Sequence, residues 1–191
     1  FPKAHAAAYV LDALRLGWYK IHYPIEFYAA YMSLRTGDIG RDVLSLNRAT
    51  LKKQIRELRQ AEEKRKASPK DKERLMTLEL VNEASARNIG FLPVDLKKSK
   101  AEEYIIENGS LRLPFSSLPG VGPVAAQKLY DFLVSCGGEV PGVDWLKKNA
   151  GISKTVVDAL ESAGALAGIA PAAPKAGREE ELLSSGQLSL F

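Results

Sequence analysis

The sequence predicts a mainly α-helical chain with a small antiparallel sheet, an α+β fold. Most of the 191 residues lie in stretches where apolar side chains recur every three or four positions, the period of an amphipathic helix. The segment 103–113 instead holds two short runs around Asn108-Gly109, the pair favoured in a two-residue hairpin turn. Two glycines around one apolar residue, at 120–122, indicate a tight turn between helices.

The first 35 residues are expected to form two helices. The segment 1–22 contains three consecutive alanines and is apolar on much of its circumference, so a long, deeply packed helix is expected there. Pro24 cannot continue that helix, but it suits the first turn of the next one, which is expected over 25–34.

Two further helices are expected between residues 42 and 87. The stretch 42–66 is dense in lysine and arginine and has a narrow apolar stripe. Its Lys64-Arg65-Lys66 run is interpreted as a solvated helix end, with direct DNA contact as the alternative. Ser68 is a candidate N-cap for a helix that begins at Pro69. The inward-facing positions of that helix are expected to be Leu75, Leu78, Val81 and Ala84.

A change of period after residue 90 indicates strands. Residues 91–96 alternate apolar and other side chains, and 103–113 is expected to form a hairpin. A small three-stranded sheet is therefore predicted just before the glycine turn.

The segment 118–126 has the pattern hydrophobic-x-Gly-hydrophobic-Gly-x-x-x-Ala, with Pro123 suited to the first turn of a helix. It resembles the helix-hairpin-helix motif, which holds a DNA phosphate without reading bases. Backbone N–H groups behind such a turn attract anions. The phosphate-binding residues are expected to be Gly120, Val121 and Gly122, with Lys128 as a nearby helper. The alternative is an ordinary Gly-Pro turn between two helices.

The segment 142–167 repeats this theme in a degenerate form. Asn149 to Lys154 is a second turn with one glycine, and Ser153 is a plausible N-cap for the following helix. This half is either a packing partner for the first turn or a second phosphate site.

The last residues are expected to be a linker and a binding tail. Residues 169–186 are rich in Ala, Pro, Gly, Glu and Ser, a composition that cannot build a core. The chain then ends with Gln187-Leu188-Ser189-Leu190-Phe191. A glutamine followed by large apolar side chains is typical of a short linear motif that inserts anchors into a pocket.

Composition excludes several classes of protein. No run approaches the ~20 apolar residues of a membrane span, and no basic-apolar signal segment opens the chain. A single cysteine, Cys136, allows no disulfide framework, which fits a reducing cytoplasm. The net charge of +4 comes from residues 41–110, with sixteen basic and twelve acidic side chains, which suits contact with nucleic acid. Because the chain begins Phe1-Pro2 without Met, it is expected to be the C-terminal part of a longer protein.

Catalytic motifs are missing from the sequence. It has no cluster of aspartates for metal-assisted phosphoryl transfer, no Walker loop and no zinc-ligand spacing. The only histidines are His5 and His22. The chain is therefore expected to be inactive alone, without a cofactor of its own.

Two segments carry a resemblance to a known family. Phe1 to Tyr9, FPKAHAAAY, and His22 to Tyr31, HYPIEFYAAY, resemble the end of the fingers domain of PolC-type bacterial DNA polymerase III alpha subunits. The terminal pentapeptide closely resembles the sliding-clamp-binding motif with which these subunits end.

The resemblance implies a function in DNA replication. The parent would be a DNA-directed DNA polymerase, a nucleotidyltransferase of the bacterial cytoplasm and replisome. It would use Mg²⁺ held by palm aspartates outside this chain. Lys3, His5 and Tyr9 would line the side of the fingers that faces the incoming nucleotide. Clamp binding would fall to Gln187, Leu188, Leu190 and Phe191, and the other partner would be double-stranded primer–template DNA.

Three regions are therefore expected. Residues 1–90 would be the C-terminal part of the fingers with connecting helices, 91–168 a duplex DNA-binding region with the helix-hairpin-helix, and 169–191 a flexible linker and clamp-binding tail. The alternative is a free-standing helix-hairpin-helix protein, or a clamp-associated repair accessory. An upstream reading frame that encodes palm aspartates would favour the polymerase.

Overall fold

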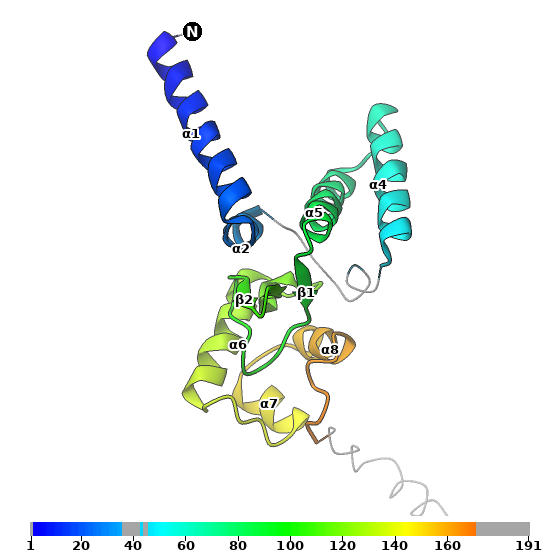
Figure 1. Ribbon diagram of the computed structural model, residues 1–191. Helices are drawn as coiled ribbons and strands as arrows, with labels where there is room; N and C mark the ends of the chain where they lie inside the picture. The colour runs from blue at the N-terminus through cyan, green and yellow to red at the C-terminus, as the bar shows by residue number, and fades with distance from the viewer. Residues whose placement is uncertain (1, 36–42, 44–45, 171–191) are drawn as a thin grey trace, which may run out of the picture.

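The computed structural model describes residues 2–35, 43 and 46–170. Its N-terminal half is helical: α1 projects away from the rest of the molecule, α2 crosses its foot, and α4 and α5 lie side by side (Figure 1). These helices are α1 (Lys3–His22), α2 (Pro24–Arg35), α4 (Arg48–Glu63) and α5 (Pro69–Ala86).

A small sheet joins this half to a second group of helices (Figure 1). The sheet contains β1 (Gly90–Leu92), β2 (Ile105–Glu107) and β3 (Ser110–Arg112). One 3₁₀ turn, η1 (Phe115–Ser117), leads into α6 (Pro123–Ser135), α7 (Val143–Asn149) and α8 (Lys154–Ser162). The mainly helical fold with a small sheet is thus confirmed.

Side-chain caps place the starts of α4 and α5. Asn47 Oδ1 accepts a hydrogen bond of 2.8 Å from the Thr50 N–H. Ser68 and Asp71 form a reciprocal capping box: Ser68 Oγ accepts from the Asp71 N–H, and Asp71 Oδ2 accepts from the Ser68 N–H. With Pro69 in the first turn, the expected start of α5 is confirmed.

The sheet is mixed. Its strand order is β1-β3-β2; β2 and β3 are antiparallel, whereas β1 and β3 are parallel. Asn108 and Gly109 both have positive φ, 50° and 75°, as the predicted two-residue turn requires. The expected antiparallel pairing is found in the hairpin of β2 and β3. Strand β1 differs from expectation and pairs with β3 in parallel, because the loop between β1 and β2 carries the chain past β3.

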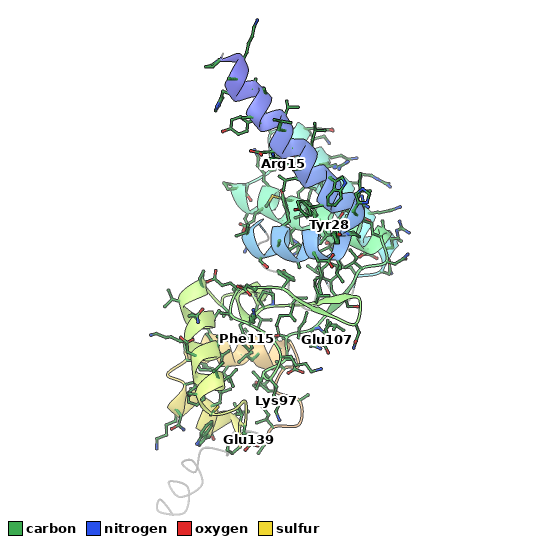
Figure 2. All side chains as sticks on the ribbon, turned by 60° about the vertical axis from the view of Figure 1, so that its left-hand side comes forward. Arg15, Tyr28, Lys97, Glu107, Phe115 and Glu139 are labelled. Carbon is green, nitrogen blue, oxygen red and sulfur yellow. The ribbon has the colours of Figure 1, made fainter. Side chains whose placement is uncertain are left out.

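The core runs continuously through the molecule. Tyr28 and Met32 on α2 pack with α5, while Leu111 and Phe115 extend the same buried cluster from the sheet towards α6 and α8. Figure 2 labels Tyr28 among the upper helices and Phe115 near the sheet. The predicted inward face of α5, Leu75, Leu78, Val81 and Ala84, is buried.

Helix α1 departs from expectation, because none of its residues is buried. Tyr9, Leu14 and Ile21 remain 65%, 65% and 68% exposed. Within the described residues the helix packs mainly against α2, and the Lys20 Nζ–Glu83 Oε1 ion pair of 2.7 Å links its last turn to α5. The predicted deep packing is therefore wrong for the described part of the chain.

Candidate nucleic-acid interface

The predicted glycine turn is present between η1 and α6. Gly120 has φ +78°, a left-handed conformation that glycine adopts without a Cβ penalty. Val121 is only 4% exposed and anchors the turn in the core, while Gly122 is the N-cap of α6 with Pro123 in its first turn. The helix that precedes the turn is reduced to η1, so the first arm of the motif is short.

The backbone donors of this turn are only partly available to a ligand. The Val121 N–H donates to the Leu118 carbonyl at 3.0 Å and is therefore occupied. The N–H groups of Gly122, Val124 and Ala125 donate to no acceptor in the described part of the chain. An anion would thus meet the first turn of α6 rather than the Val121 N–H that the sequence suggested.

A second turn with the same geometry precedes α8. Gly151 has φ +59°, Ile152 is 8% exposed, and Ser153 is the N-cap with φ −70° and ψ 161°. These values match the Gly120-Val121-Gly122 turn, in which the Gly122 N-cap has φ −73° and ψ 166°. The sequence Gly-apolar-small before a helix is the signal common to both turns, and a serine replaces the second glycine.

The two turns lie against each other. A Cβ on Gly120 would lie 3.2 Å from Thr155 Cγ2 in the first turn of α8. A hollow of about 390 Å³ is lined by residues 122–125, Lys128 and 151–153. The N-termini of α6 and α8 therefore open into one hollow.

The electrostatics of this hollow favour an anion. Its lining includes one cation, Lys128, and no carboxylate. Each helix places the positive end of its macrodipole there, and this partial charge adds to the unpaired N–H groups. No lining side chain offers a pattern of donors and acceptors that would discriminate one base from another.

Other predicted site residues lie elsewhere. Lys3, His5 and Tyr9 are exposed on α1, and the His5 and Tyr9 rings meet edge to face with centroids 4.6 Å apart. His5 and Tyr9 lie on one face of the helix, as expected. The role of the three residues in facing the incoming nucleotide stays a prediction. The clamp-binding positions Gln187, Leu188, Leu190 and Phe191 lie outside the described residues.

Two groups of interacting side chains outside the hollow contain a residue with a shifted pKa, one on the hairpin and one in the helical half. Glu107 accepts hydrogen bonds from Arg112 Nε and Lys98 Nζ, both of 2.6 Å. These two bonds, of which the one from Arg112 has the larger effect, lower the pKa of Glu107 to about 2. In the helical half, burial and the nearby Glu83 carboxylate raise the pKa of Tyr28 to about 12.

The described residues form neither a cluster of metal ligands nor a membrane-spanning helix. No group of three or more His, Cys, Asp or Glu side chains among them is placed to hold a metal ion. No helix in the part of the chain that the structure describes has the length and apolar character needed to cross a bilayer.

The chain is similar to bacterial proteins described as DNA polymerase III PolC-type. It is 35% identical over 191 residues to the Bacillus cereus protein and 38% identical over 191 residues to that of Halalkalibacterium halodurans; both matches cover the whole chain. The Oceanobacillus iheyensis protein is 39% identical over 169 residues, 88% of this chain. The chain spans about 12% of the length of each of these relatives. No protein-family model matches it.

Proposed function

We propose that this chain, which is homologous to a segment of PolC-type DNA polymerase III, holds primer–template duplex for a bacterial replicative DNA polymerase. The relatives match along the full chain, α1 as well as the two glycine turns. This continuous match favours a polymerase segment over a free-standing repair accessory, because such an accessory would need to resemble these relatives only in the glycine turns.

The observation that carries the proposal is the meeting of two glycine turns at one hollow. A backbone phosphate in this hollow would accept hydrogen bonds from Gly122, Val124 and Ala125 on one side. The Lys154 and Thr155 N–H groups of α8 would be the donors on the other, since they too have no acceptor in the described chain. Lys128 would add a screened attraction. Contacts of this kind position a duplex without reading its sequence.

Nucleotidyl transfer itself would be carried out elsewhere in the polymerase. Magnesium in such enzymes is held by carboxylates, and the described residues of this chain bring no such cluster together. We therefore assign no chemical step to this chain. Its proposed task is to hold the duplex in register while residues of other segments bind the metal and react.

A second proposed contact is with the sliding clamp. Its support is the sequence Gln187-Leu188-Ser189-Leu190-Phe191, which offers one amide and three large apolar side chains. Apolar anchors that enter a preformed pocket dominate interfaces of this size. A polymerase held on a ring around DNA would stay near the primer end after each dissociation from it.

The duplex-binding proposal is tested at Gly122. Its φ is −73°, which any residue adopts, and a Cβ there would meet nothing within 4 Å. Gly122→Val should therefore fold normally but obstruct the approach of a phosphate. We expect affinity for a fluorescently labelled duplex to fall about tenfold, equivalent to the loss of one charge-assisted hydrogen bond.

Gly17→Val is the matched control, because Gly17 also has open space around its Cβ but lies on α1. It should bind duplex like the unsubstituted chain. Two duplexes of unrelated sequence should behave alike. Unchanged binding by Gly122→Val, with an unaltered circular dichroism spectrum, would show that the hollow is not the duplex site.

A further inference from the structure

The exposed flank of α4 carries a row of cations. Arg48, Lys52 and Arg56 are four residues apart and thus lie along one side of the helix, about 6 Å from one to the next. All three are exposed. Within the described part of the chain none of them has a carboxylate partner.

This row borders a groove between α4 and α5 of about 720 Å³. Lys52, Arg56 and Arg59 line one wall, and Glu79 and Glu83 line the other. Both acids are already paired: Glu79 Oε1 accepts from Arg59 Nε at 2.7 Å, and Glu83 Oε1 lies 2.7 Å from Lys20 Nζ. Their charge is therefore largely neutralised by other cations, and the positive field of Lys52 and Arg56 is left in excess.

One further carboxylate limits the length of α4 over which the positive charge is unopposed. Glu63 lines the groove at the C-terminal end of α4. The part of the flank that attracts an anion is therefore the N-terminal half of the helix, from Arg48 to Arg56. On the adjoining face, Leu51 and Ile55 are buried, which fixes the rotation of α4 and keeps the cations outward.

The spacing of these cations fits a nucleic-acid backbone. Three charges over about 12 Å span three to four nucleotides at about 3.4 Å of axial rise per strand. The residues that line the groove include no aromatic side chain. Proteins that hold single strands without sequence preference rely on aromatic side chains for base stacking, so the lining favours contact with the backbone of a duplex.

We infer that the Arg48–Lys52–Arg56 row of α4 is a second, sequence-independent contact with duplex DNA, separate from the hollow at α6 and α8. The row belongs to the helical half of the molecule, whereas α6 and α8, whose N-termini line the hollow, lie beyond the sheet (Figure 1). The inference rests on the proposed function only in that both name duplex DNA as the partner. A duplex that reaches both would be held at two separated points, which would fix its direction as well as its position.

The salt dependence of binding tests this inference in the full 191-residue chain. Each lost phosphate contact reduces the slope of log K against log[salt] by about 0.9. The triple variant Arg48→Gln, Lys52→Gln, Arg56→Gln should therefore reduce the slope by about 2 to 3, with a labelled duplex as the probe. The control Arg15→Gln, Lys53→Gln, Lys100→Gln removes the same charge from cations that have carboxylate partners. It should retain the original slope within about 0.5.

A second variant separates this inference from the proposed function. If the row variant keeps the full slope while Gly122→Val loses affinity, the row is a solvated helix face and the inference is overturned, but the hollow stands. If the row variant loses slope while Gly122→Val binds normally, the row stands and the hollow does not. If the row variant and its charge-matched control lose the same amount of slope, the change in salt dependence comes from the net charge of the chain alone, and the inference is overturned.

Discussion

Two glycines of the same turn have different physical roles. Gly120 is required by the backbone, because its φ of +78° is rarely adopted by other residues and a Cβ there would lie 3.2 Å from Thr155 Cγ2. Gly122 has an ordinary φ and open space around it, so nothing within the described chain demands a glycine there. Ser153 occupies the matching position before α8. In the proposed function, Gly122 would allow a phosphate to approach the first turn of α6.

At this scale, short-range features could be predicted from the sequence. The Ser68 cap, the Asn108-Gly109 turn and the α6 start depend on residues within one turn of each other, so the pattern determines the geometry. The hydrogen bond from Val121 to Leu118 depends on how the chain enters the turn. No residue-type preference encodes that detail, and it changes which N–H groups are available.

Tyr28 gives a prediction about stability. Its side chain is fully buried, and its hydroxyl has no hydrogen bond of ordinary geometry within the described chain, although burial and then the nearby Glu83 carboxylate raise its pKa. Tyr28→Phe should raise the free energy of unfolding by about 1 kcal/mol, because it removes a buried polar group without breaking a bond. Tyr31→Phe, at a partly exposed ring, should change it by less than about 0.5 kcal/mol. Urea unfolding measures both.

The same residue gives a test in alkali. The pKa of Tyr28 is raised by burial from 10.0 to about 12, so the stability linked to its protonated form is complete below pH 10 and is lost as the pH rises through 12. The Phe variant should lack this loss. A less stable Tyr28→Phe protein would mean that the hydroxyl has a partner.

At the scale of elements, the sequence predicted the type of each segment, helix or strand, better than it predicted which strands pair and in which direction. The hairpin was recognisable because its turn residues have a strong conformational preference. The parallel pairing of β1 with β3 depends on the path of the loop 93–104. The pattern of a three-residue strand is too short to indicate which strand it pairs with. Ser99 Oγ donates to the Leu113 carbonyl and helps to hold that loop, a contact across 14 positions.

The ionic cluster on the hairpin predicts an acid dependence of stability. The folded pKa of Glu107, about 2, lies below its ordinary value of 4.5 because of hydrogen bonds from Arg112 and then Lys98. The stabilisation is therefore present above pH 4.5 and is lost as the pH falls towards 2. Glu107→Gln should be less stable than the unsubstituted chain at pH 7, and the difference should shrink through this window in urea unfolding.

Lys98→Met provides an intermediate case, because it removes one of the two cations and leaves Arg112 in place. Its pH profile should lie between those of the unsubstituted chain and Glu107→Gln. Parallel profiles for all three proteins from pH 7 to pH 2 would contradict the assignment of this dependence to Glu107.

At the scale of the whole molecule, the packing of α1 shows the limit of pattern reasoning. The sequence correctly predicted a helix over this segment, but the deep packing expected from its apolar circumference is not found within the described residues. The identity of the neighbour that would bury it is not encoded in the helix itself. Within the described residues that neighbour is mainly α2, which reaches only one end of α1. The two glycine turns differ from α1, because each turn packs against the other within the described residues.

The last prediction concerns the terminal pentapeptide Gln187 to Phe191 and the clamp contact proposed for it. Five residues bind modestly, because ordering them costs entropy, so their effect should come from a raised effective concentration at the primer end. In a polymerase of the proposed kind that includes this chain, deletion of the pentapeptide should abolish clamp-stimulated, processive synthesis. Distributive synthesis on short primers should stay nearly unchanged, because the proposed duplex contacts would remain. Ser189→Ala should behave like the parent, since Ser189 is expected to face outward while Leu190 and Phe191 are the anchors. If a peptide spanning 184–191 fails to bind clamp while the intact polymerase still binds, the clamp contact lies in another segment.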